Sequence, residues 1–374
     1  MKVKSKSLTA IENNTSYYGC AFFLDEDAKY KVQNCTFDNC SFRSDVTFTK
    51  IQKSYFVNCN FSKKFCLDLS EQELEIATQH LEGIAKLSSL THLDLSRTHI
   101  TELPPAIQHL VSLTHLNLPQ TKIKKLPKEI GQLSSLTHLN LSFTKIVKLP
   151  KEVEQLSSLV HLTLRGTRIK KMTKEIQRIP SLTHLDWSHS NLIEFPKEIL
   201  QLPYLVHLNL GYSDIAELPK EIGQLSSLTF LSLSNTEITK IPKEIGQLSL
   251  LTHLCLRGTS ITKLPKEIGQ LSSLTHLNLG RTQITKLPKE IGQLFSLMDL
   301  DLADTLITKL PKEIGQLSSL IHLNLGRTQI AKLPKEMGKL TSLRRLGIAF
   351  TEIKTFPKEV KNLSSLEIYR LMGS

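Results

Sequence analysis

Apolar and polar positions alternate along most of the chain in a pattern that returns every 23 residues. The segment Leu274-Thr-His-Leu-Asn-Leu279 shows the pattern, and similar segments open at Leu90, Leu113, Leu136, Leu159, Leu182, Leu205, Leu228, Leu251, Leu297, Leu320 and Leu343. Twelve full units occupy residues 90–365, and a partial unit follows at 366–374. A fixed period of this length predicts one stacked repeat array over that stretch.

Within one unit, numbered from its first leucine, apolar residues occupy places 1, 4, 6, 11, 14, 18 and 21. The alternation from place 3 to place 7 predicts a short strand, with places 4 and 6 inward and places 3, 5 and 7 outward. Proline at place 15 ends regular pairing, and Lys-Glu-Ile-Gly-Gln-Leu predicts a short helical or 3₁₀ turn. No unit can bury its apolar places alone, so neighbouring units must stack into one core.

This spacing resembles that of leucine-rich repeat proteins, in the 23-residue class with Leu-Pro-x-Glu-Ile-Gly-x-Leu. The resemblance implies an α/β fold: a curved right-handed solenoid with a parallel sheet on its concave face and short helical or 3₁₀ turns on its convex side. Relatives of this kind include leptospiral repeat proteins and effectors of legionellae. At place 9, where the family usually has asparagine, this chain has threonine or serine, such as Thr282. A hydroxyl offers fewer donors than an amide, so we expect an intact fold with a weaker polar ladder.

The segment before the repeats has a different composition. After an N-terminal tail at residues 1–16, residues 17–66 carry Phe every five residues with a small residue two places earlier. This pattern resembles a pentapeptide repeat and implies a β-rich cap of stacked coils. A zinc site is the alternative for its cysteines, although their spacing is wider than in zinc ribbons. The four candidate ligands are Cys35, Cys40, Cys59 and Cys66.

Residues 67–89 are interpreted as a degenerate opening repeat with a capping helix. Ser70 and Glu73 have the spacing of a capping box, which predicts a helix that runs to about Lys86. At the other end, the partial repeat at 366–374 offers little polar capping, which leaves a contact with a partner or with a second copy open.

Composition and charge narrow the partners. The chain has 47 Lys and Arg against 35 Asp and Glu, a net charge of +12, but the basic residues form patches rather than a continuous track. This favours a protein with an acidic surface over nucleic acid. The sequence shows neither an apolar membrane span nor a signal-peptide core, and five of its six cysteines lie in the first 66 residues. We therefore expect a reducing compartment: the bacterial cytoplasm first, and then the host cytosol.

Histidine at place 3 is the one regular row with candidate chemistry: His92, His115, His138, His161, His184, His207, His253, His276 and His322. Metal capture or pH sensing is one interpretation, since close imidazoles resist protonation. Simple copying of one ancestral unit is the other, and it is favoured. No phosphate-binding glycine loop, GxSxG, HExxH or paired CxxC motif occurs. The sequence therefore predicts no enzyme, no cofactor and no metal.

Recognition is expected where the copied units differ on their outward side, above all at place 8. Large aromatic residues and arginine are common anchors of protein interfaces. These criteria select Phe143, Arg165, His189, Tyr212, Phe230, Arg257, Arg281, Arg327 and Phe350. Neutral drift of an exposed face is the alternative, while Trp187 at inward place 6 is assigned to the core.

The function expected from these patterns is a non-enzymatic scaffold that binds a protein on its concave face, as a bacterial effector delivered into host cells by type IV secretion. The alternatives are a scaffold that stays in the bacterial cytosol, and a metal-binding or pH-sensing protein that uses the histidine row. Neither the oligomeric state nor the partner's identity follows from the sequence.

Overall fold

The computed structural model describes residues 1–52, 54–57, 59–61, 64–69, 87–171 and 174–369. The predicted capping box at Ser70 and its helix to Lys86 lie outside these residues. The chain divides into two compact units, Met1–Leu182 and Thr183–Ser374.

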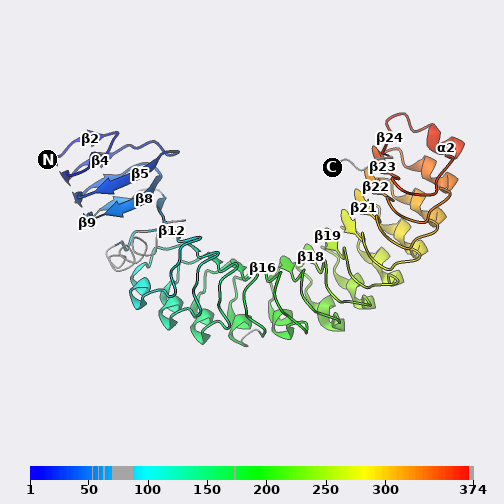
Figure 1. Cartoon of the computed structure of the whole chain (residues 1–374), viewed down its shortest axis with the longest axis horizontal. Helices are drawn as coiled ribbons and strands as arrows, with labels where there is room; N and C mark the ends of the chain where they lie inside the picture. The colour runs from blue at the N-terminus through cyan, green and yellow to red at the C-terminus, as the bar shows by residue number, and fades with distance from the viewer. Residues whose placement is uncertain (53, 58, 62–63, 70–86, 172–173, 370–374) are drawn as a thin grey trace. The chain divides into compact units, whose positions relative to one another are not determined.

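The first unit opens with coils that pass through three parallel sheets in turn (Figure 1). One sheet contains β1 (Lys2–Lys4), β3 (Ser16–Tyr18), β6 (Thr36–Asp38) and β9 (Tyr55–Val57). The second contains β2 (Ser7–Leu8), β4 (Ala21–Phe22), β7 (Ser41–Phe42) and β10 (Asn60–Phe61). The third begins with β5 (Lys29–Gln33), β8 (Val46–Gln52) and β11 (Phe65–Asp68). Because β1 and β2 pair with β3 and β4, the stretch 1–16, which the sequence analysis set apart as a tail, contributes to the same coils.

Stacked aromatic rings fill the interior of these coils. Phe42 lies between Phe22 and Phe61, with ring centroids 4.8 and 4.6 Å apart and nearly parallel planes. Phe37 stacks in the same way on Tyr17 and Phe56, at 5.1 and 4.7 Å. The five-residue spacing of Phe in the sequence thus produces two columns of rings, one ring per coil. Large buried rings supply the apolar area that such narrow coils need.

The coils and the repeats of the first unit share one sheet. The strand β11 pairs with β8 on one side and with the first repeat strand, β12, on the other, with Leu67 opposite Leu93. The backbone groups of β12 that would form an open edge are therefore hydrogen-bonded to the coils, which removes a site for uncontrolled strand addition. The repeat strands of this unit are β12 (His92–Asp94), β13 (His115–Asn117), β14 (His138–Asn140) and β15 (His161–Thr163).

The second unit repeats the same architecture without coils. Its parallel strands are β16 (His184–Asp186), β17 (His207–Asn209), β18 (Phe230–Ser232), β19 (His253–Cys255), β20 (His276–Asn278), β21 (Asp299–Asp301), β22 (His322–Asn324), β23 (Arg345–Gly347) and β24 (Glu367–Tyr369). Neighbouring strands from β16 to β23 pair in register, so residues 23 apart lie side by side, as His253 does with His276. At β24 the register shifts by one residue, because Arg345 pairs with Glu367, 22 residues further on.

Each repeat returns through a short turn on the side away from its strand (Figure 1). In the first unit the turns are the 3₁₀ helices η2 (Pro105–His109), η3 (Lys128–Gln132), η4 (Lys151–Gln155) and η5 (Lys174–Arg178). In the second they are η6 (Lys197–Gln201), η7 (Lys220–Gln224), η8 (Lys243–Gln247), η9 (Lys266–Gln270), η10 (Lys289–Gln293), η11 (Lys312–Gln316), η12 (Lys335–Lys339) and the α-helix α2 (Lys358–Lys361). The proline at place 15 precedes the turn in extended conformation, as Pro265 does at φ −68° and ψ 152°.

The core lies between strands and turns and consists of the predicted apolar places. In the repeat that opens at Leu274, the seven apolar side chains are all buried, from Leu274 itself to Leu294. Trp187 is fully buried, which confirms its assignment to the core. The predicted fold class, a leucine-rich repeat solenoid with a parallel sheet and short 3₁₀ turns, is confirmed.

The hydroxyl at place 9 bonds within its own repeat. Thr282 Oγ1 donates to the carbonyl of Leu279 at 2.7 Å, and the corresponding residue of each of the twelve repeats does the same. The side chain at this place satisfies a buried carbonyl at the end of its strand but donates no bond to the next repeat. Backbone pairing and apolar contacts therefore hold neighbouring repeats together.

The glycine at place 19 allows neighbouring turns to approach closely. A methyl group added at Gly269 would lie 2.6 Å from the carbonyl oxygen of Glu290 in the next turn. We predict that Gly269→Ala lowers the free energy of unfolding by about 1–3 kcal/mol, because the backbone must shift to relieve this overlap. Urea denaturation followed by circular dichroism measures the change.

Gly326 is the matched control for this substitution. A methyl group there meets its nearest atoms at 3.3 and 3.5 Å, so Gly326→Ala should change the unfolding midpoint little. Equal midpoints for both variants would contradict the assigned role of Gly269.

Candidate functional site

The outward side chains of the strands form rows because the repeats are in register. In the first unit His92, His115, His138 and His161 stack face to face, with centroids 4.1–4.2 Å apart and planes within 11°. In the second unit Phe230 takes a place in the row and stacks on His207 at 4.0 Å. The histidine row is thus a continuous stack of flat rings over the first four repeats.

Where place 2 is threonine, its hydroxyl fixes the orientation of the ring that follows. Thr114 Oγ1 donates its hydrogen to the carbonyl of Thr91, at 2.9 Å, and lies 2.9 Å from Nδ1 of His115. A hydroxyl has only one hydrogen, so the imidazole must donate from Nδ1, and Nε2 keeps its lone pair. The same arrangement occurs at His138, His253 and His276.

This geometry does not favour metal capture. The Nε2 lone pairs lie in the ring planes, and parallel rings direct them side by side rather than toward one point. A single ion could be shared by two neighbours only if a ring rotated away from its threonine. Within the described residues, no group of three or more His, Cys, Asp or Glu is placed to hold a metal ion. The cysteine alternative is likewise unsupported: Cys35 and Cys40 lie buried against backbone carbonyls of the coils.

The stack resists protonation. Burial, followed by the neighbouring His115, lowers the pKa of His92 to about 4. Burial and the rings on either side lower the pKa of His138 to about 4 as well. His92 and His138 are therefore neutral near pH 7.

The backbone conformation of the outward face changes at place 8, directly after the strand. All twelve residues at this place adopt a left-handed backbone conformation, with φ between 53° and 69°. Only Gly166 and Gly258 are glycines; the other ten are Arg97, Gln120, Phe143, His189, Tyr212, Asn235, Arg281, Asp304, Arg327 and Phe350. For residues with a side chain this conformation costs roughly 1–2 kcal/mol each.

In the first unit the candidates Phe143 and Arg165 lie together. The Arg165 guanidinium is 5.6 Å from the centroid of the Phe143 ring, within the range of a cation–π contact. The next repeat has Gly166 at place 8, and a methyl group there would overlap the Phe143 ring. The ring therefore lies flat over the neighbouring turn, half exposed.

In the second unit two further pairs of candidates form. His189 stacks on Tyr212 with centroids 4.0 Å apart, and the Tyr212 side chain remains 53% exposed. Arg327 lies over the ring of Phe350, at 5.3 Å. Phe230 lies in the row at place 3 rather than with the place-8 residues.

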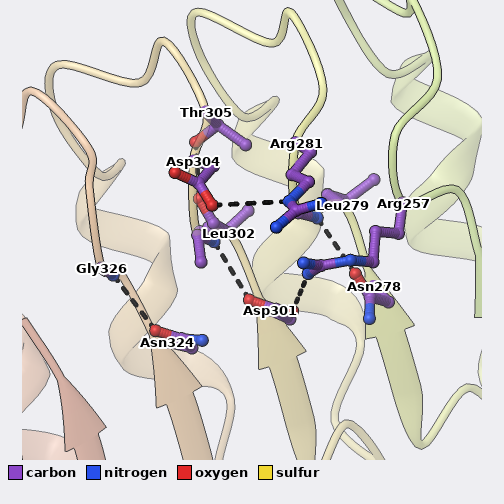
Figure 2. Close-up of polar contacts among 12 residues, drawn as sticks. Arg257, Asn278, Leu279, Arg281, Asp301, Leu302, Asp304, Thr305, Asn324 and Gly326 are labelled. Carbon is purple, nitrogen blue, oxygen red and sulfur yellow. Dashed lines mark hydrogen bonds and ion pairs between the residues drawn. The ribbon is translucent and has the colours of Figure 1, made fainter. Parts of the chain in front are cut away.

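The remaining arginines of the second unit bind carboxylates that the sequence analysis did not select. Figure 2 shows Arg257 and Arg281 directed toward β21 and the turn after it. Arg257 Nη1 is 3.4 Å from Asp301 Oδ2. Asp304 lies between Arg281 and Arg327, at 3.7 and 3.8 Å. Aspartates on the face thus partly neutralise the arginines.

Beside these ion pairs the strand face of the second unit is hollowed by a cavity of about 400 Å³. The residues at the bottom of this cavity have small side chains. Place 7 carries Ala303, Gly326 and Ala349, and place 5 of β23 carries Gly347. Asp299, Asp301, His322 and Arg345 supply its charged and titratable groups. The signal in the sequence is a run of small residues at place 7 in the repeats where Asp299 and Arg345 interrupt the histidine row.

No helix among the described residues is long and apolar enough to cross a membrane.

The lowered pKa values of the first-unit histidines predict acid sensitivity. Below their unfolded pKa of 6.5, the unfolded chain binds more protons than the folded one, so stability falls with pH between about 6.5 and 4. We expect the free energy of unfolding to drop from pH 7.5 to pH 5, by on the order of 1 kcal/mol per ring after solvent screening. Urea titrations at the two pH values measure it.

His115→Gln should reduce this pH dependence, because it removes the central neighbour of His92 and His138. His109→Gln, an exposed change on η2, is the control and should leave the dependence as it is. The same pH dependence in all three proteins would contradict the assignment.

Comparisons with known proteins agree with this architecture. A model of the leucine-rich repeat region matches residues 41–163, 243–304 and 289–373, more than half of the chain, and a single-repeat model matches 227–248. A leucine-rich repeat protein of Leptospira interrogans has a similar structure, with a TM-score of 0.76 and 32% identity over 91% of this chain and 89% of that one. An internalin of Listeria monocytogenes, at 22% identity, shares the fold with a TM-score of 0.70 over 83% and 88%.

A comparison with curated proteins gives no match. The resemblance to leucine-rich repeat proteins, leptospiral ones included, is confirmed. The narrower 23-residue class, the likeness to effectors of legionellae and that of residues 17–66 to pentapeptide repeats stay predictions. The family matches and the 32% identity to the leptospiral structure lead to one conclusion: the chain belongs to the leucine-rich repeat family.

Proposed function

We propose that the chain is a non-enzymatic scaffold that binds a partner protein on the outward face of its strands and on the place-8 residues beside them. Leucine-rich repeat proteins are generally interaction scaffolds, and rows of like residues supply few of the unlike groups that catalysis needs. Each unit presents its own part of the face.

The place-8 row carries this proposal. A left-handed position favours glycine or asparagine, yet nine of the twelve places hold other residues, and six of these nine are aromatic, histidine or arginine residues of the candidate set. Residues that persist in a costly conformation point to a role beyond folding. Phe143, Tyr212 and Phe350 hold 46%, 53% and 68% of their surface exposed, which folding alone does not require.

Charge favours an acidic partner surface. The chain has a net charge of +12, and arginines border the aromatic anchors: Arg165 at Phe143, and Arg327 at Phe350. Such pairs offer a flat apolar surface together with a guanidinium, a combination that is common at interface hot spots. A continuous basic track with stacked aromatics, which single-stranded nucleic acid would need, is missing from the sequence pattern.

The effector part of the proposal rests on the likeness to bacterial repeat proteins such as the leptospiral one. In this hypothesis the protein is made in the bacterial cytoplasm and acts on a host protein after type IV secretion. A scaffold that stays in the bacterium is the second candidate. A translocation reporter fused to the chain separates the two: a signal in host cells supports the effector, and its absence supports the resident scaffold.

The binding face is tested by removing its exposed rings. The triple variant Phe143→Ala, Tyr212→Ala, Phe350→Ala should weaken binding of a partner captured from host-cell lysate by at least about 30-fold, since anchors of this kind contribute about 2 kcal/mol or more each. Biolayer interferometry with the purified partner measures the affinity.

The control removes exposed apolar side chains elsewhere: Val111→Ala, Tyr204→Ala, Phe295→Ala. It should bind as the unchanged protein does. Full binding by the face variant, with loss in the control, would place the interface outside the strand face and contradict the proposal.

A further inference from the structure

The hollow in the second unit combines three features: space, partly buried negative charge, and a cation that already reaches it. It has a volume of about 400 Å³ and lies over β20 to β24. Place 7 carries a long side chain at Arg165 and Arg257, but along the hollow it carries Ala303, Gly326 and Ala349. A side chain from outside therefore has room to enter.

Two carboxylates of one strand face this space. Asp299 and Asp301 occupy places 3 and 5 of β21, and alternate residues of a strand lie on the same face. Asp301 is the deeper of the two, since its side chain is 17% exposed against 40% for Asp299. Burial raises the pKa of Asp301, so its charge lacks full compensation and a nearby cation would stabilise it.

The hydrogen bonds of Asp301 leave one oxygen available. Its Oδ1 accepts the backbone N–H of Ala303 at 3.0 Å. Arg257 Nη1 contacts its Oδ2 at 3.4 Å, which is longer than the 2.7–2.9 Å of a strong charge-assisted bond. A guanidinium within the chain therefore already lies against this carboxylate, without saturating it (Figure 2).

A positive group of the hollow lies nearer the surface: Arg345 at place 3 of β23 is exposed. The imidazole of His322 contacts Asp299 Oδ2 at 3.2 Å. Negative charge at depth with positive charge at the rim favours a ligand that carries its own cation on a long stem. Arginine fits this description, because its planar fork binds carboxylates with two parallel bonds and loses little hydration.

We propose that this hollow accepts an arginine side chain of the partner protein, with the guanidinium held by Asp299 and Asp301. The inference rests on the proposed function and adds a specific feature to it: a partner with an acidic surface that carries one arginine where the hollow lies. The exposed side chains at place 8 supply contact area for the partner, and the hollow fixes the position of the partner along the repeats.

The test uses a small probe and the full chain. Nα-acetyl-arginine N-methylamide is titrated against the protein and followed by ligand-observed NMR, with the citrulline analogue as a neutral isostere. We expect millimolar binding of the arginine probe and at least about tenfold weaker binding of the citrulline probe, because a hydrogen bond to a charged group contributes about 1.5–3 kcal/mol. Asp301→Asn should weaken the arginine probe by a similar factor.

A second variant changes affinity in the opposite direction, which a folding defect would not do. Arg345→Gln removes a like charge from the rim and should tighten the arginine probe several-fold. Equal binding of the two probes, unchanged binding in Asp299→Asn with Asp301→Asn, or preference for Nα-acetyl-glutamate N-methylamide would overturn the assignment.

This outcome is separable from that of the proposed function. The face variant at Phe143, Tyr212 and Phe350 leaves the hollow intact, so it should still bind the arginine probe while it loses the partner. If that variant loses the partner and the unchanged protein does not bind the arginine probe, the scaffold proposal is supported and the role of the hollow is refuted.

Discussion

Within each unit, the in-register pairing of neighbouring repeat strands up to β23 is the constraint on which the rest of the structure depends. No repeat closes a core by itself, so the buried leucines of one repeat must meet those of its neighbours. Leu277 lies opposite Leu254 on one side and Leu300 on the other. A one-residue slip would turn every inward side chain outward. Register therefore fixes the position of every other place, including those that face solvent.

Register also places each copied residue beside its counterparts in a row, and neighbouring side chains in a row affect one another's stacking and protonation. The histidines of the first unit stack within 4.2 Å, and those that follow a threonine share a tautomer set by its hydroxyl. Their stacking makes a charged state costly and points their lone pairs in parallel. The most conspicuous chemical pattern in the sequence is for this reason poorly suited to metal binding, and its main consequence is sensitivity of the fold to acid.

Much of the fold could be predicted because its cause is periodic. The strand at places 3 to 5, the turn after the proline and the burial of Trp187 all follow from the 23-residue spacing. The candidate site could be predicted only in part. Diversity at place 8 selected Phe143 and Tyr212, but their left-handed backbone was not foreseen, since glycine marks this place only twice.

The hollow was missed for a different reason. It arises from Ala303, Gly326 and Ala349 at place 7 of three neighbouring repeats, and such small residues border one cavity only when register brings them together. Asp301 looked like one more polar outward residue, because most of its counterparts in other repeats are Asn or Asp. Its depth beneath Arg257 is a property of the assembled face.

The departures from copying carry more information about function than the copies do. Duplication produces surfaces of identical groups, and identical groups bind weakly and without direction. In the second unit several features fall together: Asp299 and Arg345 replace histidine, and place 7 carries Ala303, Gly326 and Ala349. In this hollow opposite charges, room and partial burial coincide on the strand face. A repeat protein that binds one partner in one register needs such a break in its own symmetry, and this hollow provides it.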